Sequence, residues 1–110
     1  MLVITIRFIV RPEWTDRWLD LTREFTDATR AEDSNLWFRW SRDVEDPQVF
    51  YLSEGHRENG VEDHLRSPLI PKIQRDWPQA LVDTPQVLKT TIPGDEWEPL
   101  ALLPVPFPGQ

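Results

Sequence analysis

The chain has 110 residues, a formal net charge of −7 and no cysteine. This length fits one domain, the acidic charge argues against nucleic acid and anionic membranes as partners, and the lack of cysteine excludes disulfides and thiolate metal sites. The apolar first residues carry no signal-peptide pattern, and no apolar run is long enough to span a membrane, so we expect a cytoplasmic protein. The chain has six tryptophans and five phenylalanines. A core of this size has difficulty burying that many large rings, so we expect some of them to line a pocket or a subunit interface.

The N-terminal third predicts a strand followed by a helix. Residues 2–10 are mostly branched and apolar, with Thr5 and Arg7 on one face, which is typical of a strand with one buried side. Pro12 suits a first helical turn, and apolar residues then recur every three or four positions, so we expect a helix over 13–31. Its predicted buried stripe consists of Trp14, Trp18, Leu21, Phe25 and Ala28.

The middle of the chain predicts a hairpin. Strands are expected over 35–42 and 49–56, joined by an acidic, proline-containing turn. Because side chains alternate between the faces of a strand, the second strand divides into two sets. One face carries Phe50, Leu52, Glu54 and His56, and the other carries Val49, Tyr51, Ser53 and Gly55.

The remainder predicts helical segments, a last strand and a tail. We expect a helical stretch over 61–66 and a second one starting at Ser67-Pro68, with Leu69, Ile73 and Trp77 as its buried stripe and Pro78 ending or kinking it. A last strand is expected over 86–92. Residues 93–110 are rich in proline and in large apolar side chains, so we expect this tail to dock, either on a partner subunit or as a lid on its own.

The predicted order of elements over residues 1–92 is β-α-β-β-α-β, the ferredoxin-like arrangement of an α+β domain with an antiparallel sheet. Two helices can cover only one face of such a sheet, yet both faces of the hairpin carry large residues. This pattern predicts a homodimer in which two sheets pack face to face.

Two polar residues are candidates for chemistry. His64 is expected on a short helix facing the sheet, and imidazole exchanges protons near neutral pH, so it could act as a general base. The alternative is a structural histidine that bonds Glu54, itself a carboxylate among apolar neighbours. A metal site would need His56, His64 and carboxylates, and the spacing of eight residues gives no helical ligand pair, so no metal is predicted.

The remaining candidates would bind substrate. Aromatic side chains could stack on an aromatic molecule, although rings in strands more often belong to the core or an interface. Arg39 could hold a phenolate, or could instead form a surface ion pair. The predicted substrate-binding residues are Trp37, Phe38, Arg39, Trp40, Phe50, Glu54 and Trp77.

Five stretches of the chain resemble the antibiotic biosynthesis monooxygenase family: Thr26–Glu32, Leu36–Phe38, Asp46–Phe50, Ser53–Glu54 and His64–Ser67. The resemblance covers residues 2–92 and leaves the tail outside. It implies a dimeric α+β barrel and the oxidation of a small phenol- or quinol-like aromatic by O₂, with neither metal nor other cofactor.

Two other functions stay open. A non-catalytic dimeric protein that binds a small molecule would use the same cavity, and it could have the polar atoms of His64 tied up by Glu54. A haem-degrading enzyme is disfavoured, because the family's haem-degrading branch carries an Asn on the first strand, which this chain lacks. That branch also places its haem-binding His further along, where this chain has Leu69 or Ile70.

Overall fold

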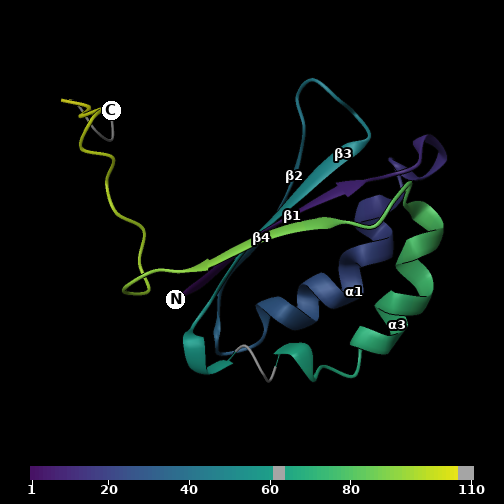
Figure 1. Cartoon of the computed structure of the whole chain (residues 1–110), viewed down its shortest axis with the longest axis horizontal. Coiled ribbons are helices and arrows are strands. Elements are labelled where there is room, and N and C mark those ends of the chain that lie inside the picture. The colour runs from purple at the N-terminus through teal and green to yellow at the C-terminus, as the bar shows by residue number, and fades with distance from the viewer. Residues whose placement is uncertain (61–63, 107–110) are drawn as a thin grey trace.

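The computed structural model describes residues 1–60 and 64–106 of the chain. Its elements are β1 (Leu2–Ile9), α1 (Trp18–Arg30), β2 (Asn35–Arg42), β3 (Val49–His56), α3 (Ile70–Asp76) and β4 (Gln86–Thr91), with single 3-10 turns at Pro12–Trp14, Glu58–Gly60 and Trp77–Ala80. Both helices lie on the same side of the sheet (Figure 1). The predicted ferredoxin-like α+β arrangement is confirmed. No helix in the described part of the chain is long and apolar enough to cross a membrane.

The sheet has the strand order β2-β3-β1-β4, and every neighbouring pair is antiparallel. Its register sets one row across the sheet in which Glu54 of β3 pairs with Ile4 of β1 and with Phe38 of β2. Since side chains alternate, this row points to the same face as Phe50 and Leu52, the face that the helices cover. The helix-covered face of the sheet therefore carries one buried carboxylate, Glu54, beside mainly apolar side chains.

Helix α1 begins at Trp18, five residues later than the pattern predicted. Pro12 starts a separate 3-10 turn, and the hydroxyl and backbone N–H of Thr15 both donate to the Pro12 carbonyl and close it. A further turn, in which the Arg17 N–H donates to the Trp14 carbonyl, leads into the α-helix. The buried face of α1 consists of Trp18, Thr22, Phe25, Thr26 and Thr29.

Threonines can occupy this buried face because hydrogen bonds satisfy some of their hydroxyls. The Thr26 hydroxyl donates to the Thr22 carbonyl at 2.9 Å and accepts from the Trp40 indole N–H, also at 2.9 Å. Helix α1 is thereby tied to β2 through side chains as well as by packing. The apolar stripe predicted from the sequence did not include these threonines, so it accounted for only part of the buried face of α1.

The core between sheet and helices is largely aromatic. Trp18 is fully buried and meets Trp77 edge-on at 5.5 Å and Trp40 at 5.7 Å between ring centroids. Such ring pairs contribute about 0.5–1.5 kcal/mol each beyond their area burial. The buried core residues around them are Phe8, Val10, Phe25, Phe38, Phe50, Leu52, Ala80 and Leu81.

Proline decides where the second helical region ends. Helix α3 runs from Ile70 to Asp76, and Pro78 lies in the 3-10 turn that follows, as the sequence predicted. Before the helix, the Ser67 hydroxyl accepts a hydrogen bond from the Leu69 backbone N–H at 3.3 Å. The first three residues of the helical stretch predicted over 61–66 lie outside the described residues.

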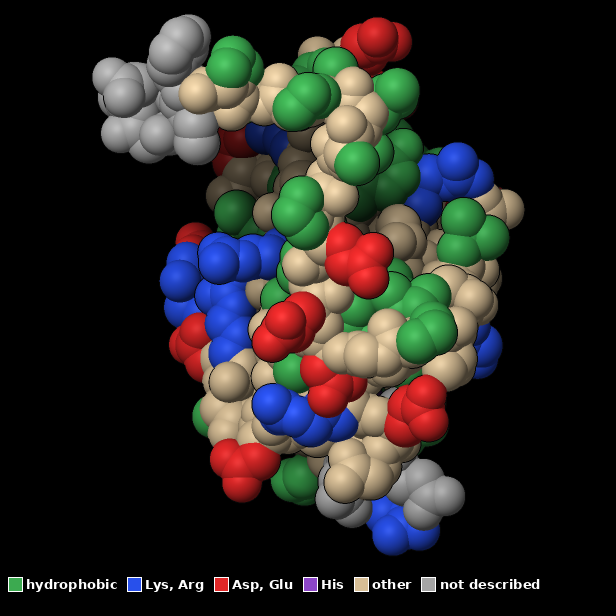
Figure 2. Space-filling view, turned by 90° about the vertical axis from the view of Figure 1, so that its left-hand side faces the viewer, with side chains coloured by type: hydrophobic (Ala, Val, Ile, Leu, Met, Phe, Trp, Pro, Cys, Tyr) green, Lys and Arg blue, Asp and Glu red, His purple; other side chains and the backbone are tan. Residues whose placement is uncertain are grey.

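The tail leaves the end of β4 and runs away from the helices (Figure 1). Trp97 packs on Trp37 of β2, with ring centroids 5.1 Å apart. The apolar side chains beyond it are exposed, namely Leu100, Leu102, Leu103 and Val105, and Figure 2 shows hydrophobic side chains along this part of the surface. Docking of the tail on a partner subunit stays a prediction.

Candidate active site

A cavity of about 460 Å³ lies between the helices and the sheet. Its walls come from the helix-facing side chains of β1 and β3 and from α1, α3 and the turn after α3. They include Ile4, Ile6, Phe8, Phe25, Leu52, Ile73 and Trp77. Glu54 and His64 also line it, beside Ile4 at the end where β1 begins. The cavity is thus an apolar, ring-lined space that holds a carboxylate and an imidazole.

Glu54 contacts two histidines that are far apart in the sequence. Its Oε1 lies 2.9 Å from Nε2 of His56 and 3.6 Å from Nε2 of His64. The two imidazole centroids are 4.7 Å apart. Glu54, His56 and His64 are 3%, 0% and 8% exposed, so water screens this group poorly.

Glu32 contacts the other side of the His64 ring. The carboxylate lies just beyond the end of α1, and its oxygens are 3.2 and 3.4 Å from His64 Nδ1. An ionised carboxylate only accepts hydrogen bonds, so a hydrogen bond between these groups requires the tautomer with N–H at Nδ1. The ring of Phe25 packs against the imidazole at 5.5 Å. His64 is therefore held between two carboxylates, one inside and one 25% exposed.

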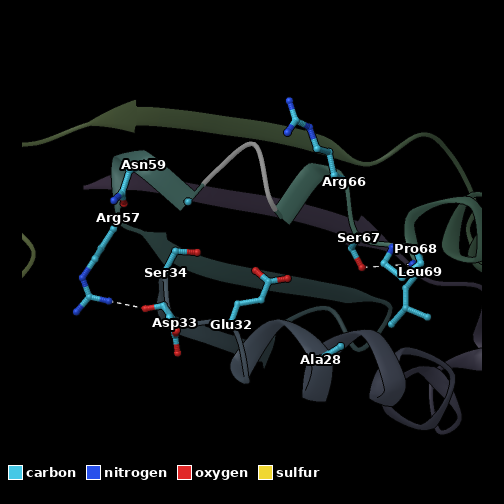
Figure 3. A pocket seen from close by; sticks show the side chains of 11 residues that line it. Ala28, Glu32, Asp33, Ser34, Arg57, Asn59, Arg66, Ser67, Pro68 and Leu69 are labelled. Atoms are coloured by element: carbon cyan, nitrogen blue, oxygen red, sulfur yellow. Dashed lines mark hydrogen bonds between the residues drawn. The ribbon is translucent and has the colours of Figure 1, made fainter.

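A second, larger hollow of about 750 Å³ lies outside this group (Figure 3). Most of the residues that line it have polar side chains, and Figure 3 shows Glu32 among them. Arg57 turns away from the hollow and donates to the Asp33 carbonyl at 2.5 Å. We take the inner cavity as the candidate active site, because it combines apolar walls with buried ionisable groups. Glu32 lines the outer hollow and contacts His64, which lines the inner cavity.

The predicted site residues fall into three groups. Glu54, His64 and Trp77 line the inner cavity. Phe38, Trp40 and Phe50 point to the same side of the sheet but belong to the aromatic core. Trp37 and Arg39 lie on the opposite face, because side chains alternate along β2.

On that opposite face, Trp37 covers Gly55 and donates its indole N–H to the Ser53 hydroxyl at 2.9 Å. Neither Trp37 nor Arg39 lines the inner cavity. Glu32, which contacts His64, was not among the site residues expected from the sequence. The only signal for it was its place at the end of the first resembling stretch.

The family model described as "Antibiotic biosynthesis monooxygenase" matches residues 1–76. Among solved structures, one described as an antibiotic biosynthesis monooxygenase is 22% identical, with a TM-score of 0.74 over 84% of this chain and 98% of that one. The protein Rv0793 from Mycobacterium tuberculosis is 21% identical, with a TM-score of 0.75 over 88% and 98%. A Deinococcus radiodurans protein is 19% identical, with a TM-score of 0.78 over 91% and 99%. No curated protein matches the chain. Identities this low support the fold alone.

Proposed function

This chain belongs to the antibiotic biosynthesis monooxygenase family, and we propose that it oxidises a small phenol- or quinol-like aromatic with O₂ in the inner cavity, without a bound cofactor. The observation that carries the proposal is the placement of His64 and Glu54 inside a cavity with apolar and aromatic walls. An aromatic substrate of one or two rings suits the volume and the lining of this space.

The chemistry balances without an external reductant. When a phenol becomes a quinone, one oxygen atom of O₂ replaces a ring hydrogen as a carbonyl and the other leaves as water. The substrate supplies all the electrons for both steps. A phenolate gives up an electron far more readily than a phenol, so the protein's main task is to remove the hydroxyl proton and exclude water.

His64 is the proposed base. Its Nε2 is 3.6 Å from Glu54, which is beyond hydrogen-bond distance, while Glu32 holds the proton on Nδ1. The ring therefore presents a lone pair on the side that faces Glu54 and the cavity. After it takes the substrate proton, the imidazolium lies between two carboxylates that stabilise its charge. A purely structural histidine would need no such exposure to the cavity.

The partner we propose is a second copy of the chain. The face of the sheet that the helices leave uncovered carries Trp37, Tyr51 and Leu88, and Leu88 is 78% exposed. Packing two such faces would remove these side chains from water and would complete an α+β barrel. A stable interface of this kind buries on the order of 2,000 Å² in total.

The test is turnover of substituted phenols and hydroquinones, followed by O₂ consumption and product mass. Replacing His64 by Gln should lower turnover by about 10²–10⁴-fold if it is the base. The matched control is Arg23→Gln, which changes an exposed side chain on the outer face of α1 and should leave the rate unchanged. Full activity of His64→Gln would remove it from the mechanism. Tight binding of the aromatics with no O₂ consumption would favour the non-catalytic binding protein.

A further inference from the structure

We propose that the substrate of the inner cavity carries an acidic group in addition to its phenolic hydroxyl, and that Lys89 binds this group; this rests on the proposed oxidation, which takes place in the same cavity. Most of the cavity lining is apolar. The polar residues among the described lining are Glu54, His64, Gln74 and Lys89. Lys89 is the only lysine or arginine among them, so it is the group that would attract an anion.

The sheet register places Lys89 in the same row as Glu54. Ile4 of β1 pairs with Glu54 of β3 on one side and with Lys89 of β4 on the other. Directly opposed residues point to the same face of a sheet, and both charged side chains line the cavity. Since neighbouring strands lie about 4.8 Å apart, the backbones of the two residues are about 10 Å apart. The cavity therefore holds its carboxylate on one side of Ile4 and an ammonium on the other.

The ammonium of Lys89 has no protein partner that would neutralise it. Its nearest neighbours on the same face are Val87 and Thr91 along β4 and Ile4 opposite, none of which can form an ion pair. No residue in the described part of the chain forms a hydrogen bond or ion pair with it. The only other lysine, Lys72, is bonded to Glu24. Lys89 is exposed, so an acidic group bound there would keep part of its hydration.

The charges around the cavity would orient a substrate of this kind. The chain carries a net charge of −7, so an anion is repelled unless a cation lies near it. With the acidic group at Lys89, the ring lies among the apolar walls and the hydroxyl points toward His64. The reverse orientation would bring the acidic group against the buried carboxylate of Glu54. One favoured orientation is what positioning for proton removal by His64 requires.

A second polar group, Gln74, lines the same cavity. Ile70, Ile73, Gln74 and Trp77 follow the spacing of one helical face, and all four line the cavity. An amide therefore occupies a place on an otherwise apolar stripe, and its N–H groups can donate to an anion. Arg39, the cation that the sequence suggested for a phenolate, points to the opposite face of the sheet and cannot take this role.

The experiment measures binding to the full chain by calorimetry without O₂, so that no turnover occurs. The probes are para-hydroxyphenylacetate and a hydroxynaphthoate, each compared with its neutral amide. Each acid should bind about 5–20-fold more tightly than its amide, because hydrogen bonds to charged groups are the stronger ones. Added salt should weaken the binding of the acids alone. Lys89→Met should remove the preference for the acid, and Lys89→Arg should keep most of it.

The matched control is Lys72→Met, which removes the other lysine outside the inner cavity and should leave the preference unchanged. Equal binding of acid and amide, binding of neither, or a preference that survives in Lys89→Met would overturn the proposal. Lys89 would then serve only to protect the edge strand β4 from pairing with other chains. O₂ consumption is measured separately. Oxidation without a preference for acids would leave the proposed function standing, and a preference without oxidation would leave only the acidic ligand.

Discussion

On the uncovered face of the sheet, the ring of Trp37 packs directly over Gly55, in the space that a side chain at this position would fill. A Cβ atom added at Gly55 would lie 2.2 Å from Trp37 Cζ3, where ordinary contacts begin near 3.4 Å. In Gly55→Ala the indole must therefore retreat by more than an ångström. It would lose its place above β3 and strain or break its hydrogen bond to Ser53.

In Gly55→Ala, the clash with Trp37 lowers the stability, whereas the replacement of glycine by alanine within a strand raises it. Overpacking of this kind costs about 1–3 kcal/mol, and a lost hydrogen bond costs about 0.5–1.5 kcal/mol. Alanine in a strand is itself better than glycine by roughly 0.5–1 kcal/mol. The clash should win, with a net loss near 2 kcal/mol and a fall in Tm of roughly 8–16 °C.

The assay is thermal unfolding by far-UV circular dichroism at one fixed protein concentration, since any dimer makes Tm depend on concentration. The informative control is Trp37→Ala, in which the clash is absent. In that background Gly55→Ala should be neutral or stabilising, so the sign of its effect reverses. If Gly55→Ala keeps or raises the Tm of the original protein, the packing argument is refuted.

Three further predictions concern the assembly and the core. Light scattering at micromolar concentration should give the mass of a dimer, and a monomer there would contradict the face-to-face sheet packing. Deleting 95–110 should weaken that dimer or lower its Tm by several degrees, because it removes Trp97 and the apolar tail. An unchanged dimer with easier ligand access would favour the lid. Thr26→Val should cost about 1–3 kcal/mol in urea unfolding, because the Trp40 indole loses its acceptor, whereas Thr26→Ser should keep most of the stability. Equal stability of the two variants would show that this hydrogen bond contributes nothing.

The start of α1 shows how far local pattern can be trusted. The period of the apolar residues identified the helix correctly. The pattern could not separate the turn at Pro12–Trp14 from the helix that begins at Trp18, because both place Trp14 and Trp18 toward the core. The pattern of apolar residues also could not predict that threonines of α1 would be buried. Thr26 is tolerated inside only because Trp40, on a different element, donates to it.

The sequence by itself determined the order of the elements, the alternation of faces in β3 and the position of Glu54 on an apolar face. These features depend on residues that are close together in the chain, where the alternation of a strand and the 3.6-residue period of a helix fix which side chains share a face. Only the tertiary structure decided that the opposite face holds Trp37, that Glu32 contacts His64, and that His56 and His64 meet at one carboxylate oxygen. Those contacts join residues that are distant in sequence, and they form because sheet register and helix packing, which no local pattern encodes, bring the elements together.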